Sequence, residues 1–201
     1  MIEVAPAESV SLIMEHLREH AEQIARHRHG CRIICRLLQR SYKRKQENPS
    51  LSELAGLEEL LREVLNKAQA LCCHIFAHHV IQYVLENTNN PEHKNKIFEA
   101  LNGELQRCAQ DRHASSVIQA ALKCCRPCDV NSLADGLIDV VPSLATTRCG
   151  SYVYNTLCVH EDPDIKARAI GHQGEGHRRA QAGQGPAAGQ HSRDETGEAG
   201  P

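Results

Sequence analysis

The chain has 201 residues, of which 41% are apolar and 24% are charged, so it is long enough to bury a core. Aromatic residues make up only 3% and Trp is absent, so aliphatic residues and Cys must build that core, which favours helices over a β-sandwich. The formal net charge of −2 gives no whole-chain indication of nucleic-acid or membrane binding.

The N-terminal residues Met1–Pro6 lack the basic and apolar regions of a signal peptide, and no apolar run approaches the length of a membrane span. We therefore expect a cytoplasmic protein without membrane association, while nuclear and nucleolar locations stay open. In that setting the ten Cys residues are interpreted as reduced thiols.

Apolar residues spaced by three and four predict helices along most of the chain. They fall into upstream helices around residues 9–25, 53–71, 93–109 and 130–147. Turn or breaker residues follow at Asn87–Pro91 and Arg126–Pro127, and Pro142 is expected to open or kink a short helix.

Two polar segments interrupt this pattern. Residues 41–52 contain Lys43-Arg44-Lys45 and Asn48-Pro49-Ser50, which predict an inserted loop. Residues 171–201 contain no Val, Ile, Leu, Met, Phe, Tyr or Cys, so they have no apolar area to offset the entropy of ordering. We expect this C-terminal tail to be disordered.

Four segments share one template, in which a small residue is followed by two variable, two apolar, two variable and two apolar positions. They begin at Gly30, Ala77, Ala114 and Gly150, which lie 47, 37 and 36 residues apart. Self-similarity at this period is typical of a solenoid of helical units. The template helices are expected near residues 30–40, 77–87, 114–125 and 150–159.

On each template helix the apolar positions form one buried stripe. The second, third and sixth positions should then lie on the opposite face and line a continuous surface across the stack. We predict an all-α, right-handed α-solenoid of about four repeats over residues 10–165, with residues 1–9 as a flank and 166–201 as an incomplete cap and disordered tail.

The strings Gly30-Cys-Arg-Ile-Ile, Val80-Ile-Gln and Ala114-Ser-Ser-Val-Ile-Gln resemble the Pumilio (PUF) repeat family, and the order of motifs resembles the C-terminal half of its eight-repeat domain. The resemblance implies that each repeat presents three side chains to one RNA base, two at the base edge and one stacking. In the family this half reads the 5′ part of a UGUA-type element, because the RNA runs antiparallel to the repeats.

Carried over by position, the resemblance implies twelve RNA-binding residues, three in each repeat. The stacking residues would be Arg32, His79, Ser116 and Tyr152. The edge-contacting residues would be Cys31, Cys35, His78, Gln82, Ser115, Gln119, Ser151 and Asn155. Ser116 departs from the pattern because it cannot stack, and Cys35 and Asn155 stand where the family usually has Gln or Glu.

Residues 26–45 hold eight basic residues and no acid. Within them Arg32, Arg36 and Arg40 recur every fourth residue, so Arg36 and Arg40 are predicted phosphate contacts on one helix face. A solvated helix face and loop is the simpler alternative for this run.

The Cys and His clusters, which include His27, His29, Cys31 and the pair Cys125 and Cys128, offer no complete four-ligand zinc site. No oxyanion-hole loop, phosphate loop or paired-carboxylate motif accompanies them. We therefore expect no catalytic residues, metal, cofactor or small-molecule substrate.

The resulting hypothesis is single-stranded RNA binding through the concave face, one base per repeat, in control of mRNA translation or decay. The RNA would be an mRNA 3′ untranslated region, with regulatory proteins as further partners. The alternative is a helical-repeat protein-interaction scaffold, or a truncated remnant without sequence-specific RNA binding, which would explain the nearly neutral net charge.

Overall fold

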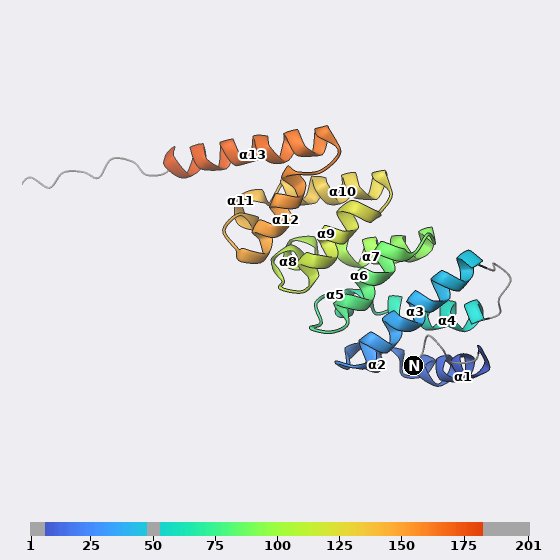
Figure 1. Cartoon of the computed structure of the whole chain (residues 1–201). Helices are drawn as coiled ribbons and strands as arrows, with labels where there is room; N and C mark the ends of the chain where they lie inside the picture. The colour runs from blue at the N-terminus through green and yellow to red at the C-terminus, as the bar shows by residue number, and fades with distance from the viewer. Residues whose placement is uncertain (1–6, 48–52, 183–201) are drawn as a thin grey trace, which may run out of the picture.

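The computed structural model describes residues 7–47 and 53–182 (Figure 1). Over these ranges the regular secondary structure is entirely helical, and none of the described helices has the length and apolar character needed to cross a bilayer. The helices are α1 (Ala7–Arg18), α2 (Ala21–Arg26), α3 (Gly30–Glu47), α4 (Glu53–Leu65), α5 (Ala68–Cys72), α6 (His78–Asn87), α7 (Pro91–Asn102), α8 (Leu105–Gln110), α9 (Ala114–Cys124), α10 (Pro127–Ile138), α11 (Val141–Leu144), α12 (Arg148–Cys158) and α13 (Pro163–Ala182).

The helices repeat in groups of three: a long helix, a short helix and a template helix. The template helices α3, α6, α9 and α12 pack against one another in chain order. The long helices α1, α4, α7 and α10 form a second row in the same order, as Figure 1 shows along the length of the molecule. The predicted all-α solenoid of four repeats is therefore confirmed.

Each predicted upstream helix is in fact two helices. The breaks occur at His20, Lys67, Glu104 and Val140, where φ lies between −109° and −137° and ψ between 7° and 40°. This backbone conformation lies near the sparsely populated bridge region. The four residues share no type, so the sequence carries no common signal for the break.

The helix starts follow the predicted breakers. The Asn90 side chain accepts a hydrogen bond from the backbone N–H of Glu92, and Pro91 takes the first helical position, where its missing N–H leaves nothing unpaired. Pro127 opens α10, and Pro142 lies in the first turn of the four-residue helix α11.

The boundaries of the two polar segments differ from the prediction. Residues 41–47 are not a loop but the last part of α3, because this stretch contains no Gly or Pro and is rich in helix-forming Lys, Arg, Gln and Glu. Residues 48–52 lie outside the described residues. At the C-terminus α13 continues past Ile170 to Ala182, and residues 183–201 lie outside the described residues.

The start of α13 covers the last repeat. Ile165 and Ala169 are 1% and 0% exposed, and α13 packs against α10, α11 and α12. The start of the segment that was expected to be an incomplete cap therefore packs as a helix against the fourth repeat.

The first repeat is less completely covered than the others. Its first template apolar residue, Ile33, is 37% exposed, whereas the equivalent Val80, Val117 and Val153 are fully buried. The same contrast holds on the long helices. Ile13 is 37% exposed, whereas the equivalent Leu60, Ile97 and Leu133 are fully buried. In the fourth repeat Tyr154, which occupies an apolar template position, is 8% exposed and belongs to the core.

The small residue at the start of each template reflects a close approach of the chain. A Cβ atom at Gly30 would meet the backbone carbonyl of Ile24, and one at Gly150 would meet that of Leu144, both inside van der Waals contact. The template helix is thus packed directly against the short helix that precedes it.

Candidate nucleic-acid interface

The third and sixth template positions lie on the row of template helices and reach the surface to different extents. Arg32, His79, Tyr152 and Asn155 are exposed, and Cys35, Gln82, Ser116 and Gln119 are half-buried. Because α3, α6, α9 and α12 pack in order, these side chains form a series along the stack, as the resemblance implied.

The second template position was predicted to lie on the exposed face, but in the structure it is buried in three of the four repeats. Cys31, His78 and Ser115 are 3%, 7% and 4% exposed, and only Ser151 is half-buried. The reason is helical geometry: the second position precedes the fifth by three residues, which places both on the same side of the helix. Since the fifth position belongs to the apolar stripe, its neighbour is drawn into the core.

A pocket of about 600 Å³ lies between the beginnings of α3 and α6. Its lining combines three guanidinium groups, two aromatic rings, two thiols and one aliphatic side chain. These belong to Arg28, Arg32, Arg36, Phe76, His79, Cys31, Cys35 and Ile75. Planar cationic and aromatic groups facing one space are suited to stacking on a nucleobase, while the remaining guanidinium groups can pair with phosphate.

Both thiols in this pocket donate hydrogen bonds to backbone carbonyl groups. Cys31 Sγ donates to the carbonyl oxygen of Arg28 at 3.5 Å, and Cys35 Sγ donates to that of His79 at 3.9 Å. Burial, followed by the neighbouring Cys31, raises the pKa of Cys35 to about 12. Cys35 therefore stays protonated at neutral pH, and it neither attacks as a thiolate nor repels a phosphate.

Three histidine rings pack together at the start of α6. The rings of His78 and His79 have centroids 3.9 Å apart, and those of His78 and His113 are 4.8 Å apart. His78 Nδ1 is 2.9 Å from the carbonyl oxygen of His74. Burial is the main cause that lowers the pKa of both His78 and His79, and nearby cationic groups lower it further. The contacts among these three rings join the second and third repeats.

In the third and fourth repeats four of the predicted contacts already have intramolecular hydrogen-bond partners. The hydroxyls of Ser115, Ser116 and Ser151 donate to backbone carbonyls three residues earlier. Gln119 Nε2 donates to the carbonyl of Ser115 at 3.2 Å, and its Oε1 accepts from Thr156 Oγ1 at 3.4 Å. RNA binding at these positions would replace intramolecular hydrogen bonds by hydrogen bonds to the bases. The net gain in binding free energy is therefore limited.

The two predicted phosphate contacts have different environments. Arg36 is exposed, and its Nη1 donates to Gln39 Oε1 at 2.9 Å. Arg40 is only 6% exposed, so it does not share the exposed helix face that was expected for it. A step of four residues turns an α-helix by about 40° beyond a full circle, so two steps carry Arg40 about 80° away from Arg32 and into the packed side.

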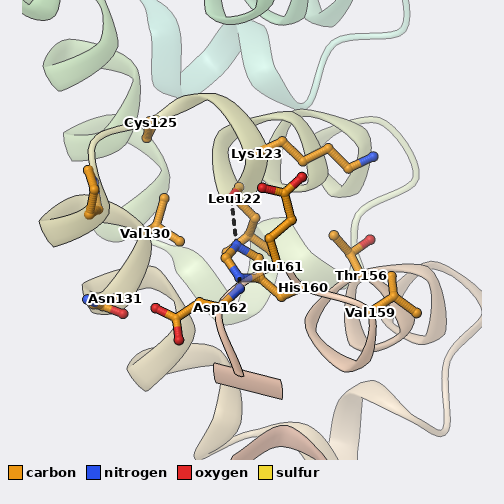
Figure 2. A pocket seen from close by; sticks show the side chains of 11 residues that line it. Leu122, Lys123, Cys125, Val130, Asn131, Thr156, Val159, His160, Glu161 and Asp162 are labelled. Atoms are coloured by element: carbon orange, nitrogen blue, oxygen red, sulfur yellow. Dashed lines mark hydrogen bonds between the residues drawn. The ribbon is translucent and has the colours of Figure 1, made fainter. Parts of the chain in front are cut away.

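A second hollow of about 470 Å³ opens near the ends of α9 and α12 (Figure 2). Leu122 and Val130 line it with Val159, and the dashed line in Figure 2 marks the contact from His160 Nε2 to the carbonyl oxygen of Leu122, 3.0 Å long. None of the predicted RNA contacts lines this hollow, so it lies apart from the candidate interface.

In the described parts of the chain, no three His, Cys, Asp or Glu side chains come together in a way that could hold a metal ion. Cys125 and Cys128, the pair with zinc-like spacing, are free thiols in this structure, and burial raises the pKa of Cys125 to about 11.

The fold and the series of template positions define an α-solenoid built from Pumilio-like repeats. A family model described as "Pumilio-family RNA binding repeat" matches residues 20–43, 68–101 and 106–135. Together with the curated relatives, this match makes the chain a member of the Pumilio (PUF) repeat family. The fourth template lies beyond the matched residues and is identified by its register and by the structure.

Among curated proteins, pumilio homolog 13 of Arabidopsis thaliana is 27% identical over 154 residues, which cover 77% of this chain and 27% of that protein. Fem-3 mRNA-binding factor 2 of Caenorhabditis elegans is 25% identical over 130 residues, 60% of this chain and 20% of that protein. The chain therefore spans about a quarter or less of these relatives' length.

Solved structures share the fold at low sequence identity. PUF-6 in complex with 5BE13 RNA has a TM-score of 0.70 at 20% identity, with 90% of this chain and 55% of that chain covered. The Puf3 RNA-binding domain bound to a Cox17 RNA 3′ UTR recognition sequence has a TM-score of 0.66 at 20% identity, covering 79% and 43%.

Proposed function

We propose that this chain binds single-stranded RNA along the row of template helices, one base per repeat, in post-transcriptional control of mRNA. The observation that carries this proposal is the pocket between α3 and α6. There Arg32 and His79, which occupy the same template position in adjacent repeats, line one space together with Arg28 and Arg36. Membership of the Pumilio family and the likeness to PUF–RNA complexes support the same function.

The repeats offer different chemistry to a base. In the first two repeats Arg32 and His79 provide planar groups, and Gln82 provides an amide whose Nε2 now donates to Glu86 Oε1 at 2.8 Å. In the fourth repeat Tyr152 is 49% exposed and provides a ring. Ser116 provides neither a ring nor a guanidinium, so the third repeat should hold its base most weakly.

The test is fluorescence-anisotropy titration of the full chain with a pool of short single-stranded RNAs, at about 50 and 200 mM salt. Arg32→Ala and His79→Ala should each weaken binding, because a base–ring stack contributes about 1–3 kcal/mol, which is about 5- to 150-fold in affinity. Gln82→Ala and Gln119→Ala should alter which sequences are selected.

Two exposed residues away from the interface provide matched controls. Arg62→Ala removes an exposed guanidinium from α4, and His172→Ala removes an exposed imidazole from α13. Both variants should bind RNA like the parent chain. Equal losses in Arg32→Ala and Arg62→Ala, or no RNA binding at either salt concentration, would overturn the proposal and leave a protein-interaction scaffold as the better reading.

A further inference from the structure

Each template helix is capped by the residue three positions before its small residue. These capping residues are His27, His74, Asp111 and Thr147, and they keep the repeat spacing of 47, 37 and 36 residues. Asp111 Oδ1 accepts hydrogen bonds from the N–H groups of His113 and Ala114, both at 2.8 Å, and Thr147 Oγ1 accepts from that of Gly150 at 3.1 Å. One acceptor thus satisfies the otherwise unpaired N–H groups at the start of the helix.

The first two repeats use a histidine ring for the same purpose. His27 Nδ1 accepts from the N–H groups of His29 and Gly30, both at 3.3 Å. His74 Nδ1 accepts from those of Phe76 and Ala77 at 3.2 and 3.3 Å. Nδ1 can accept only when it carries no proton, so both rings must be neutral with the proton on Nε2.

Protonation would reverse the effect of these caps. An imidazolium presents an N–H where the helix also presents N–H groups, and it adds positive charge to the positive end of the helix dipole. An aspartate in the same place accepts hydrogen bonds and carries the favourable charge. The four repeats therefore divide into two capped by an imidazole nitrogen and two capped by a side-chain oxygen.

The groups around His74 also oppose its protonation. Arg26 faces it from α2 and His113 from the start of α9, while His78 on α6 contacts its carbonyl oxygen. Burial, then Arg26, then His113 lower the pKa of His74 from its ordinary value of 6.5. Around His27 the nearest ring is that of His29, with centroids 5.6 Å apart.

We propose that His27 and His74 are positioning residues for RNA binding, which hold the starts of α3 and α6 in place only while their rings are neutral. Acid then releases the two helices that carry Arg32 and His79 and weakens the pocket between them. This inference rests on the proposed function, and it adds a dependence on pH that the Asp111 and Thr147 repeats do not share.

The experiment compares the full chain with the double variant His27→Asp/His74→Asp, which installs the cap that the chain itself uses in its third repeat. RNA affinity and thermal midpoint are measured at about pH 8 and about pH 5.5, on either side of the imidazole pKa. The RNA affinity of the parent divided by that of the variant should be lower at about pH 5.5 than at about pH 8. The expected decrease is about fivefold for each lost cap, because a cap usually contributes about 1 kcal/mol. Taking the ratio removes the effect of protonating His79, which both proteins share.

Two further variants test the assignment. Asp111→His should add a new loss of thermal stability between about pH 8 and about pH 5.5, because it replaces the carboxylate cap of the third repeat by an imidazole cap. His172→Asp changes an exposed histidine outside any cap and should leave the pH profile unchanged.

The outcomes separate the two proposals. Loss of all RNA binding at about pH 8 would refute the proposed function, while the thermal midpoints would still report on the caps. Parallel pH profiles of the parent and the double variant, in both affinity and thermal midpoint, would overturn the inference.

Discussion

Replacing Gly150 by Ala tests the close packing of template helix against short helix. The added Cβ would lie 2.6 Å from Thr147 Oγ1 and 2.8 Å from Leu144 Cα, besides meeting the carbonyl of Leu144. Two of these three atoms belong to the backbone, so the short helix must move. The third atom belongs to the cap of the same helix.

The magnitude follows from three contributions. Overpacking costs about 1–3 kcal/mol, and a disturbed cap costs about 1 kcal/mol. The greater helix propensity of Ala over Gly offsets about 1 kcal/mol of this loss. We therefore expect Gly150→Ala to destabilise the chain by about 1–3 kcal/mol, or by about 2–4 °C in Tm for each kcal/mol in a chain of this size.

The assay is urea unfolding followed by circular dichroism, with two other Gly→Ala variants as controls. A Cβ at Gly171 meets nothing within 4 Å, and one at Gly103 lies 3.6 Å from the carbonyl oxygen of Glu99, an ordinary contact. Gly171→Ala should be neutral or slightly stabilising, because it changes helix propensity alone. If Gly150→Ala were as stable as Gly171→Ala, the close approach would not constrain the repeat.

Three other predictions concern burial, capping and charge. Ile34→Ala should cost about 2–5 kcal/mol because Ile34 is 0% exposed, whereas Ile33→Ala at 37% exposure should cost clearly less; equal losses in urea unfolding would contradict the repeat register. Asn90→Ala should cost about 1 kcal/mol through loss of the α7 cap, and Asn90→Ser should recover most of it in the same assay. Arg36→Ala should reduce the slope of log affinity against log salt by about 0.7, and Arg40→Ala should leave the slope unchanged; the reverse would restore Arg40 as a phosphate contact.

The repeats and the register of the template helices were predictable, because both follow from the spacing of small residues along the chain. The interval between Gly30, Ala77, Ala114 and Gly150 identifies the repeats and the register of the template helices, because a small residue is required where the short helix approaches. The breaks at His20, Lys67, Glu104 and Val140 were not predictable, since a backbone turn accepted by such different side chains leaves no compositional signal.

The site was predictable in outline and less so in detail. The third positions Arg32, His79 and Tyr152 are exposed as expected. The burial of Cys31 follows from its spacing of three residues from the apolar Ile34, and that of Arg40 follows from the extra 40° that each step of four residues adds around the helix. The caps His27 and His74 were missed as a pair, although a polar residue three positions before each small residue is visible in the sequence.

The unequal burial of the first and fourth repeats sets the order in which this chain should unfold. In a one-dimensional array the repeat with the least buried surface opens first, and among the described repeats that is the first, because its Ile13 and Ile33 are partly exposed, whereas α13 packs against the fourth. Amide protons of α2 and α3 should therefore exchange sooner than those of α9 and α12. The first repeat also carries Arg28, Arg32 and Arg36. An RNA strand bound across α3 and α6 would therefore stabilise the repeat that opens most easily.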